Sequence, residues 1–160
     1  MMTDLEFMPI NMERDAQVCV DHYKDSCVAA GISAPRTFSS SAYIDQLRAK
    51  CKESDRWFAH VWEDDRIVGD CFLGIYRDDY SLGYINRLYV IPELRGSGIA
   101  GRIHQYILDF FAKLEKRGIR LRSYVANGRA RNFYIKMGYR VISENDGIEL
   151  MERIGTQPET

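Results

Sequence analysis

The segment Tyr84–Ala100, YINRLYVIPELRGSGIA, constrains the fold of this chain more than any other stretch. Apolar residues alternate up to Pro92, and a short turn with Gly96 and Gly98 leads into residues with helical spacing. This pattern predicts a strand, a glycine-rich turn and a helix whose first turn lies inside the glycine stretch. The first N–H groups of a helix are unpaired and carry partial positive charge, and glycine lets a bulky anion approach them closely. The segment therefore predicts a pyrophosphate-binding turn.

Other nucleotide sites also use glycine-rich turns. Gly96, Gly98 and Gly101 match the dinucleotide fingerprint G-x-G-x-x-G. That fingerprint needs an acidic residue about 20 residues further on, at the end of a second strand, whereas residues 117–122 contain only Gly, Ile, Leu and Arg. The sequence also lacks a phosphate loop of the GxxxxGK[ST] type. A tight turn without a ligand is the alternative at this point.

A second motif follows an apolar strand predicted at Leu121–Val125. Its residues have the spacing N-x-x-A-x-x-x-Y-x-x-x-G-[FY], on a short helix that a glycine closes at the C′ position. They are Asn127, Ala130, Tyr134, Gly138 and Tyr139.

Together the two motifs resemble those of the GNAT superfamily of acetyl-coenzyme A-dependent N-acetyltransferases. The family's first motif, [RQ]-x-x-G-x-[GA], corresponds to Arg95, Gly98 and Ala100, and its LYVxP sequence precedes them at residues 88–92. The resemblance covers residues 57–153 well and residues 1–56 only in the order of elements.

This resemblance implies acetyl-coenzyme A as co-substrate. The cysteines lack CxxC spacing, so no metal is expected. Backbone groups of residues 88–90 would pair with the pantetheine arm, the amides of residues 95–100 would hold the pyrophosphate, and two asparagines would hydrogen-bond the arm or the acyl end. The implied cofactor-binding residues are Leu88, Tyr89, Val90, Arg95, Gly96, Ser97, Gly98, Ile99, Ala100, Asn127, Asn132 and Tyr134.

The resemblance also assigns catalytic positions. Tyr134 would face the sulfur and protonate the leaving thiolate, although packing beside Phe133 and Tyr139 is an alternative role for this ring. Many family members carry a glutamate four residues before the Leu of LYV, and this chain has Tyr84 there. Asn86 shares the face of Tyr84 if the strand alternates, and neither residue is a strong base at neutral pH.

Without a positioned carboxylate, the site suits acceptors with a low amine pKa, or it relays the amine proton through water to bulk. An α-amine with a pKa near 7.7–8.0 is neutral roughly one time in ten at pH 7, whereas a lysine-type amine near 10.4 is neutral about once in two thousand. Asp78 and Asp79, in the preceding turn, could act through water, but a solvated turn is the alternative that we favour for them.

The remaining periodicity predicts the order β-α-α-β-β-β-α-β-α-β-β. This order gives an α/β class with a twisted mixed sheet of about seven strands and helices on both faces, in agreement with the GNAT fold. In the long helix, Ile99, Ile103, Ile107, Phe110 and Leu114 are expected to face inward, and Gly118 to stop it. The expected strands are Leu5–Ile10, Trp57–Trp62, Ile67–Tyr76, Tyr84–Val90, Leu121–Val125, Tyr139–Ser143 and Ile148–Arg153, and the first three helices Glu13–Ala30, Ser39–Lys52 and about Ser97–Lys116.

Length and composition set the broad class. A chain of 160 residues with 46% apolar residues fits one domain, expected at residues 1–154, with residues 155–160 as a disordered tail. The N-terminus lacks an apolar signal region and no apolar run reaches the length of a membrane span, so a cytoplasmic location without membrane insertion is expected. The 4 cysteines lack CxxC spacing and are interpreted as core residues. His22, His60 and His104 lie on three predicted elements and are interpreted as structural or solvent-facing.

The distribution of charge and the predicted loops indicate what the protein could bind. Nine Lys or Arg against one acid between Lys113 and Arg140 fit a coenzyme A phosphate environment or a solvated helix face, with a nucleic-acid surface as a minority alternative. The acceptor pocket is expected from Gly31–Ser41, the turn after Tyr76 and the loop Glu144–Gly147. Acidic turns there would favour a cationic acceptor, but a role as merely exposed turns is the alternative that we favour. The leading function is acetyl transfer to an amine of an unidentified acceptor. The alternatives are toxin-like acetylation of aminoacyl-tRNA α-amines and a non-catalytic acyl-coenzyme A-binding domain, and a homodimer is a family-based expectation.

Overall fold

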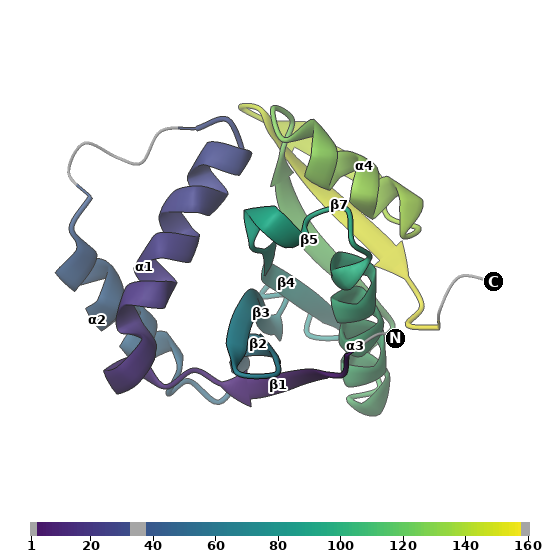
Figure 1. Cartoon of the computed structure of the whole chain (residues 1–160). Helices are drawn as coiled ribbons and strands as arrows, with labels where there is room; N and C mark the ends of the chain where they lie inside the picture. The colour runs from purple at the N-terminus through teal and green to yellow at the C-terminus, as the bar shows by residue number, and fades with distance from the viewer. Residues whose placement is uncertain (1–2, 33–37, 158–160) are drawn as a thin grey trace. The chain divides into compact units, whose positions relative to one another are not determined.

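The computed structural model describes residues 3–32 and 38–157. Seven strands are hydrogen bonded in the order β1-β2-β3-β4-β5-β7-β6. The β4–β5 pair is parallel, whereas β1–β2, β5–β7 and β6–β7 are antiparallel, so the predicted mixed sheet and the predicted element order are confirmed. The elements (Figure 1) are β1 (Leu5–Pro9), α1 (Met12–Ala29), α2 (Ser40–Lys50), β2 (Arg56–Glu63), β3 (Arg66–Ile75), β4 (Leu82–Val90), the 3-10 turn η1 (Pro92–Leu94), α3 (Ile99–Lys113), β5 (Gly118–Tyr124), α4 (Gly128–Lys136), β6 (Arg140–Asn145) and β7 (Ile148–Ile154).

The chain forms two compact units. The first contains the residues up to Phe72 together with Arg87–Ala100, and the second contains Leu73–Asn86 together with the residues from Gly101 onward. The single domain expected from the sequence stays a prediction. In the described part of the chain, no helix has the length and apolar character that a bilayer span requires.

In the first unit, β1 pairs antiparallel with β2, and helices α1 and α2 lie side by side (Figure 1). Asn11 and Ser39 cap the two helices by accepting hydrogen bonds from the N–H groups three residues later. Gly31 ends α1 with a φ of 72°, because the N–H of Ile32 bonds the carbonyl of Cys27 in a Schellman arrangement, as predicted. The core of this unit contains Met12, Cys19, Leu47 and Phe72.

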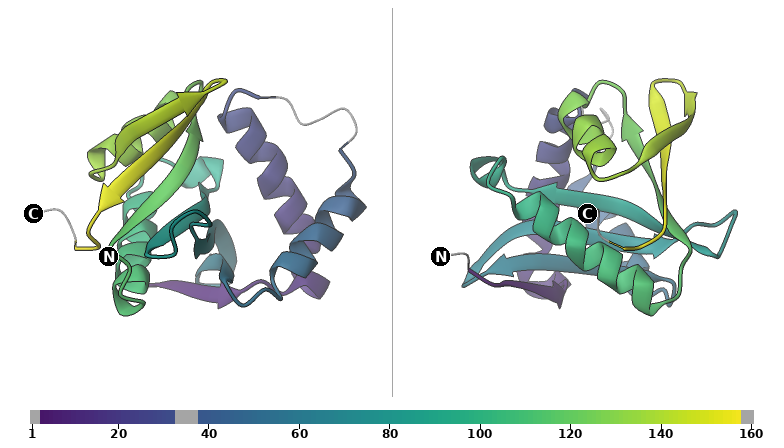
Figure 2. Two further views of the ribbon diagram at one scale, coloured as in Figure 1. Left: turned by 180° about the vertical axis from the view of Figure 1, so that it is seen from behind. Right: turned by 90° about the vertical axis from the view of Figure 1, so that its right-hand side faces the viewer.

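In the second unit, β5 and the β6–β7 hairpin run side by side, and α4 lies beside β5 (Figure 2). The hairpin turns at Asp146 and Gly147, both with positive φ (51° and 78°), which is the type I′ geometry that an Asp-Gly pair favours. The tail predicted to be disordered is only partly described. Arg153 donates to the carbonyls of Gly155 and Gln157, and residues 158–160 lie outside the described residues.

Helix α3 differs from its prediction at both ends. It begins at Ile99, after the glycines, and ends at Lys113, where Glu115 adopts a φ of 56° and the N–H of Lys116 bonds the carbonyl of Phe111. Gly118, the predicted stop, instead begins β5, where a Cβ would come within 2.5 Å of the Arg153 carbonyl oxygen.

The inward face of α3 was predicted correctly only in its first half. Ile99, Ile103 and Ile107 are buried, but Phe110 is half-buried and Leu114 lies beyond the helix end and is exposed. Phe111 and Leu108 take the buried positions, because a helix face advances four residues from Ile107 to Phe111. The other predicted ends differ from the observed ones by three residues at most.

Gly83 is expected to be essential for packing in the second unit. A Cβ at this position would lie 2.5 Å from the ring of Phe111, which is fully buried and has little space to move. The variant Gly83→Ala should therefore lose about 1–3 kcal/mol of unfolding free energy in urea titrations. The matched control is Gly101→Ala in α3, where the added methyl meets nothing within 4 Å and stability should stay equal or rise. Equal stability of both variants would contradict this packing account.

Candidate functional site

The glycine turn lies between η1 and α3. Gly96 and Gly98 have φ values of 81° and 93°, a region that residues with side chains rarely adopt. A Cβ on Gly98 would meet nothing within 4 Å, so the space next to this glycine is open. Because α3 begins at Ile99, its unpaired N–H groups directly follow the second glycine. The turn thus has the backbone conformation that an anion-binding helix start requires, although the helix begins later than predicted.

The side chain of Arg95, the first residue of the glycine motif, is directed toward α1. Its Nη2 donates to Asp25 Oδ2 at 2.6 Å and its Nε to the Val90 carbonyl at 2.9 Å. Tyr89 Oη donates to the same carboxylate oxygen at 2.6 Å. Burial alone would raise the pKa of Asp25, but the hydrogen bonds from Tyr89 and Arg95 outweigh it and lower the pKa. Asp25 therefore stays ionised and ties the end of β4 and the glycine turn to α1.

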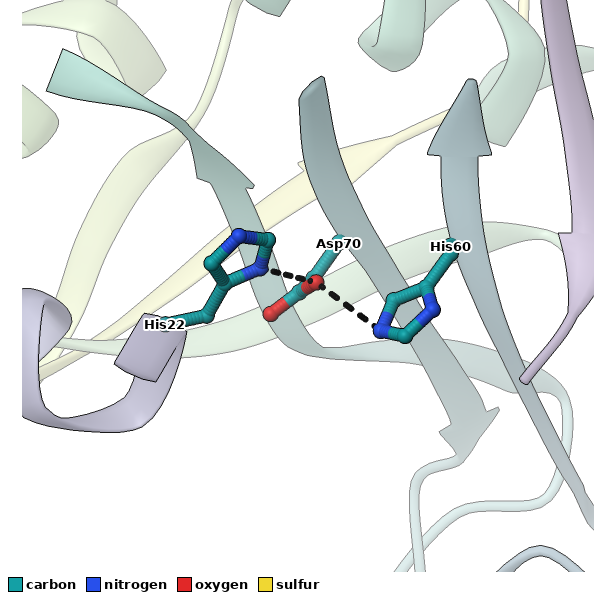
Figure 3. A group of neighbouring side chains, drawn as sticks. All are labelled: His22, His60 and Asp70. Carbon is teal, nitrogen blue, oxygen red and sulfur yellow. Dashed lines mark hydrogen bonds and ion pairs between the residues drawn. The ribbon is translucent and has the colours of Figure 1, made fainter. Parts of the chain in front are cut away.

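Next to this network, Asp70 of β3 is completely buried between two histidines (Figure 3). His22 Nδ1 lies 2.8 Å and His60 Nε2 lies 3.7 Å from Asp70 Oδ1. Arg87 Nη1 lies 3.5 Å from Oδ2, and the pKa of His60 is lowered chiefly by burial. No sequence pattern predicts this cluster, because its members come from three elements that are separate in the chain, α1, β2 and β3. The one available signal was a charged residue, Asp70, inside the otherwise apolar strand IVGDCFLGI.

The cluster offers ligand atoms of a kind that zinc accepts, all within 4.8 Å of one another. His22 hydrogen-bonds Asp70 Oδ1 and the charge of Arg87 lies 3.5 Å from Oδ2, but Oδ2 itself and His60 Nδ1 are buried without a hydrogen-bond partner among the described residues. The expectation that the protein uses no metal stays a prediction.

In the second unit, Tyr84 lies where many relatives are expected to hold a glutamate. Its ring stacks on Tyr76 with centroids 5.9 Å apart, and its hydroxyl accepts a hydrogen bond from Arg122 Nη1 at 3.3 Å. Arg120 lies over the Tyr76 ring at 4.8 Å. Asn86, on the same strand, is exposed. The position of the expected base is thus occupied by a phenol in a cationic and aromatic environment.

The carboxylate of Asp79, which could have acted through water, is engaged elsewhere. It accepts from Ser81 Oγ at 2.6 Å and from Arg117 Nη2 at 2.5 Å. These hydrogen bonds lower the pKa of Asp79 to about 2, so it is a weak base. The turn role favoured from the sequence agrees with this arrangement.

The second motif builds α4. Asn127 caps it by accepting from the Ala130 N–H at 3.2 Å. Gly138, with a φ of 93°, closes it as predicted, because the Tyr139 N–H bonds the Tyr134 carbonyl at 3.0 Å. The Tyr134 side chain is buried, edge-on to the rings of Phe133 (5.2 Å) and Tyr139 (5.4 Å). Tyr134 thus has the packing contacts of the structural alternative, and Asn132 is exposed.

Tyr139 connects α4 to α3. Its hydroxyl lies 2.9 Å from Nε2 of His104, and both side chains are buried. Burial, assisted by the charge of Arg153, lowers the pKa of His104 to about 4, so the imidazole is neutral at pH 7. His104 is therefore structural, which is one of the two roles expected for it from the sequence.

Several cations of the basic stretch pair with carboxylates of their own unit. This pairing favours a structural use of those side chains over a nucleic-acid surface. The pairs are Arg117 with Asp79 (2.5 Å), Arg120 with Glu152 (2.6 Å), Arg131 with Glu149 (2.6 Å) and Arg140 with Glu152 (3.6 Å).

Of the loops expected to build the acceptor pocket, Gly31–Ser41 lies partly outside the described residues, at positions 33–37. In the Glu144–Gly147 loop, Glu144 Oε1 accepts a hydrogen bond from the Gly147 N–H at 3.2 Å. At least one of the acidic side chains in this loop therefore stabilises its own turn.

Asp25 is expected to stabilise the first unit through its two donors. The variant Asp25→Ala leaves Arg95 and Tyr89 without their shared acceptor, and should lose about 1–3 kcal/mol of unfolding free energy. The control is Asp21→Ala on the same helix, because Asp21 is exposed and contacts Gln17 one turn away. Urea titration of both variants checks this expectation. A loss at Asp25 no larger than the loss at Asp21 would contradict it.

Comparisons with known proteins agree on the fold. In the solved PaiA N-acetyltransferase of Thermoplasma acidophilum, in complex with coenzyme A, 99% of the chain matches 94% of this one, at 20% identity and a TM-score of 0.78. The spermidine N-acetyltransferase of Vibrio cholerae, in complex with CoA and spermine, matches 95% of this chain over 96% of its own, at 14% identity and a TM-score of 0.76. At these identities the likeness shows the fold.

Sequence comparison goes further. N-alpha-acetyltransferase 30 of Schizosaccharomyces pombe is 32% identical over an alignment of 94 residues, and the match covers 52% of this chain. The chain spans 63% of that relative, which is less than two thirds of its length. The model of the acetyltransferase (GNAT) domain matches residues 54–141, more than half of the chain, and includes both motifs. The chain therefore belongs to the acetyltransferase (GNAT) domain family.

Proposed function

We propose that the protein is an N-acetyltransferase that transfers the acetyl group of acetyl-coenzyme A to a primary amine by direct attack in a ternary complex. Family membership supports this function, and so does the name of the relative at 32% identity. The observation that carries it is the pair of left-handed glycines, Gly96 and Gly98, directly before the first N–H groups of α3. A diphosphate is the anion that such a turn suits.

The residues of the glycine turn fit coenzyme A in this proposal. The backbone amides of Gly96 and of residues 98–100 would hold its pyrophosphate, because the N–H groups of Arg95 and Ser97 bond the Pro92 and Leu94 carbonyls within the turn. The open space beside Gly98 admits a bulky group. The side chain of Arg95 contributes indirectly, since it pairs with Asp25 and positions the turn. Leu88, Tyr89 and Val90 would pair with the pantetheine arm through their backbone groups, as the family resemblance implies.

The transfer forms an N–C bond at the thioester carbonyl and breaks the C–S bond. A backbone N–H at the end of β4 would polarise the carbonyl oxygen. Tyr134 would donate its proton to the leaving sulfur. A thiol with a pKa near 8.5 and a phenol with a pKa near 10 lie within about two units of each other, so the proton can be shared in the transition state. The buried position of Tyr134 among aromatic rings suits a neutral donor.

In this proposal no protein carboxylate removes the amine proton, because position 84 carries a tyrosine in place of the family's glutamate. Asp79 is bound by Arg117 and Ser81, and Glu152 is bound by Arg120. We therefore propose that water takes the proton and that α-amines are the preferred acceptors. The acceptor itself, a homodimer and a cytoplasmic location stay predictions.

Tyr134→Phe tests the acid role. Acetyl transfer, measured as release of free thiol with a broad amine panel, should fall about 10²-fold or more while coenzyme A affinity by calorimetry stays within a few-fold. Tyr80→Phe, at an exposed tyrosine of the same unit, is the control and should retain full activity. Unchanged turnover in Tyr134→Phe would remove the acid assignment. Thiol release that stays undetectable with every amine, despite coenzyme A binding, would favour the non-catalytic domain.

A pH–rate profile over an acceptor series tests the proposed absence of a protein base. Peptide α-amines should exceed lysine ε-amines in kcat/KM at pH 7, and the apparent pKa of each profile should follow the amine of the acceptor. The rate should rise with pH up to the pKa of the acceptor amine, because only the neutral amine is a nucleophile. A pKa of about 6 that is the same for all acceptors would indicate a dedicated protein base instead.

A further inference from the structure

The second unit contains a small pocket that is lined by side chains of β5, β6 and β7. Its volume is about 270 Å³. Sites for whole drug-sized ligands occupy about 300–1,000 Å³, so this pocket suits one side chain or one small group. Its lining residues are Arg122, Ser143, Asn145, Ile148 and Leu150.

Arg122 is the charged residue of this pocket. Its guanidinium lies over the rings of Tyr76 and Tyr84, 5.9 Å from each centroid, and donates one hydrogen bond to the Tyr84 hydroxyl. Among the described residues Arg122 has no carboxylate within ion-pair distance, whereas its strand neighbour Arg120 binds Glu152 at 2.6 Å. An arginine stays charged at every physiological pH and has five N–H donors. The pocket therefore presents a permanent, solvent-exposed positive charge that no carboxylate of the described residues neutralises.

The other lining residues define what could meet this charge. Ser143 and Asn145 add hydrogen-bonding groups, and Ile148 and Leu150 add apolar walls. Glu144 and Asp146 of the neighbouring turn are not among the lining residues, so the cationic acceptor that acidic turns would favour finds no carboxylate here. A short apolar stem that ends in an oxyanion matches this combination, because a guanidinium binds carboxylate or phosphate oxygens through two parallel N–H groups.

The contact with Tyr84 relates the pocket to the reaction. Tyr84 occupies the position at which many relatives are expected to carry the base, and Arg122 touches its hydroxyl. We infer that this pocket is the anion subsite of the acceptor, and that the preferred acceptor carries a carboxylate or phosphate on a short stem close to its reacting amine. This inference rests on the proposed acetyl transfer, and names the chemical class of its acceptor.

Matched peptides test the subsite. One series carries Glu or Gln at the first or second position behind a free α-amine, and a second series replaces Glu by phosphoserine or by Lys. In the wild type, kcat/KM from thiol release should be about tenfold higher for Glu than for Gln at one of the two positions, and lowest for Lys. The phosphoserine peptide distinguishes a phosphate from a carboxylate preference.

Substitutions of Arg122 test directly whether its guanidinium binds the anionic group. In Arg122→Gln the Glu-to-Gln ratio should fall to about one, and Arg122→Lys should keep part of it, since a lysine keeps the charge without the planar fork. The matched control is Arg140→Gln, because Arg140 is an exposed arginine on β6 that lies outside the pocket and pairs with Glu152. This control should keep the tenfold ratio. Equal melting temperatures would show that the variants fold.

The outcomes separate the two proposals. Thiol release that is equal for Glu, Gln and phosphoserine peptides in the wild type would overturn the anion subsite and leave acetyl transfer standing. If no amine yields thiol, acetyl transfer fails, and calorimetry with the same peptides still decides the subsite. A tenfold difference in Kd between Glu and Gln peptides that Arg122→Gln removes would support it. Equal Kd values would overturn it.

Discussion

The carboxylate of Asp25 holds together the parts of the first unit on which the glycine turn depends. One of its oxygens accepts from Arg95 at the turn and from Tyr89 on β4, each at 2.6 Å. Two donors on one partly buried oxygen fix its charge and give both side chains a single geometry. Because Arg95 also binds the Val90 carbonyl, the strand end and the turn share one anchor on α1. The conformation of the turn requires only the backbone freedom of Gly96 and Gly98. The side-chain network therefore fixes where the turn lies, not its conformation.

The buried Asp70 extends this anchor into the core. A fully buried carboxylate is costly unless its charge is balanced, and here His22 hydrogen-bonds one oxygen while Arg87 lies near the other. His22 in turn packs its ring against Tyr89 at 4.5 Å, so the polar core touches the Asp25 network. Arg87 also donates to Tyr43 of α2. A single polar chain therefore links α1, α2, β3 and β4 within the first unit, with a geometry that apolar packing alone would specify less strictly.

Local chemistry explains which parts of the fold were predictable. Asn127 and Gly138 cap α4, and Asp146-Gly147 turns the last hairpin, because each needs only its immediate neighbours. The end of α3 was not predictable in this way, since Glu115 adopts the left-handed conformation that glycine usually supplies. The polar contacts were harder still. His22 lies 48 residues from Asp70 and Tyr84 lies 38 residues from Arg122, and no spacing rule joins residues across such distances.

The pair formed by Tyr84 and Arg122 would affect both the loss of the acceptor's amine proton and the binding of charged groups on the acceptor. A guanidinium beside the position of a family base would favour loss of a proton from a nearby ammonium, because a fixed positive charge disfavours a second one. The same charge attracts an anionic group on the acceptor, provided that this group lies on the side of the pocket. An α-amine with an acidic group close by meets both conditions, since its amine needs little assistance and its anion compensates Arg122. An ε-amine on a long cationic stem meets neither, because it brings a second positive charge toward an arginine that has no carboxylate partner among the described residues.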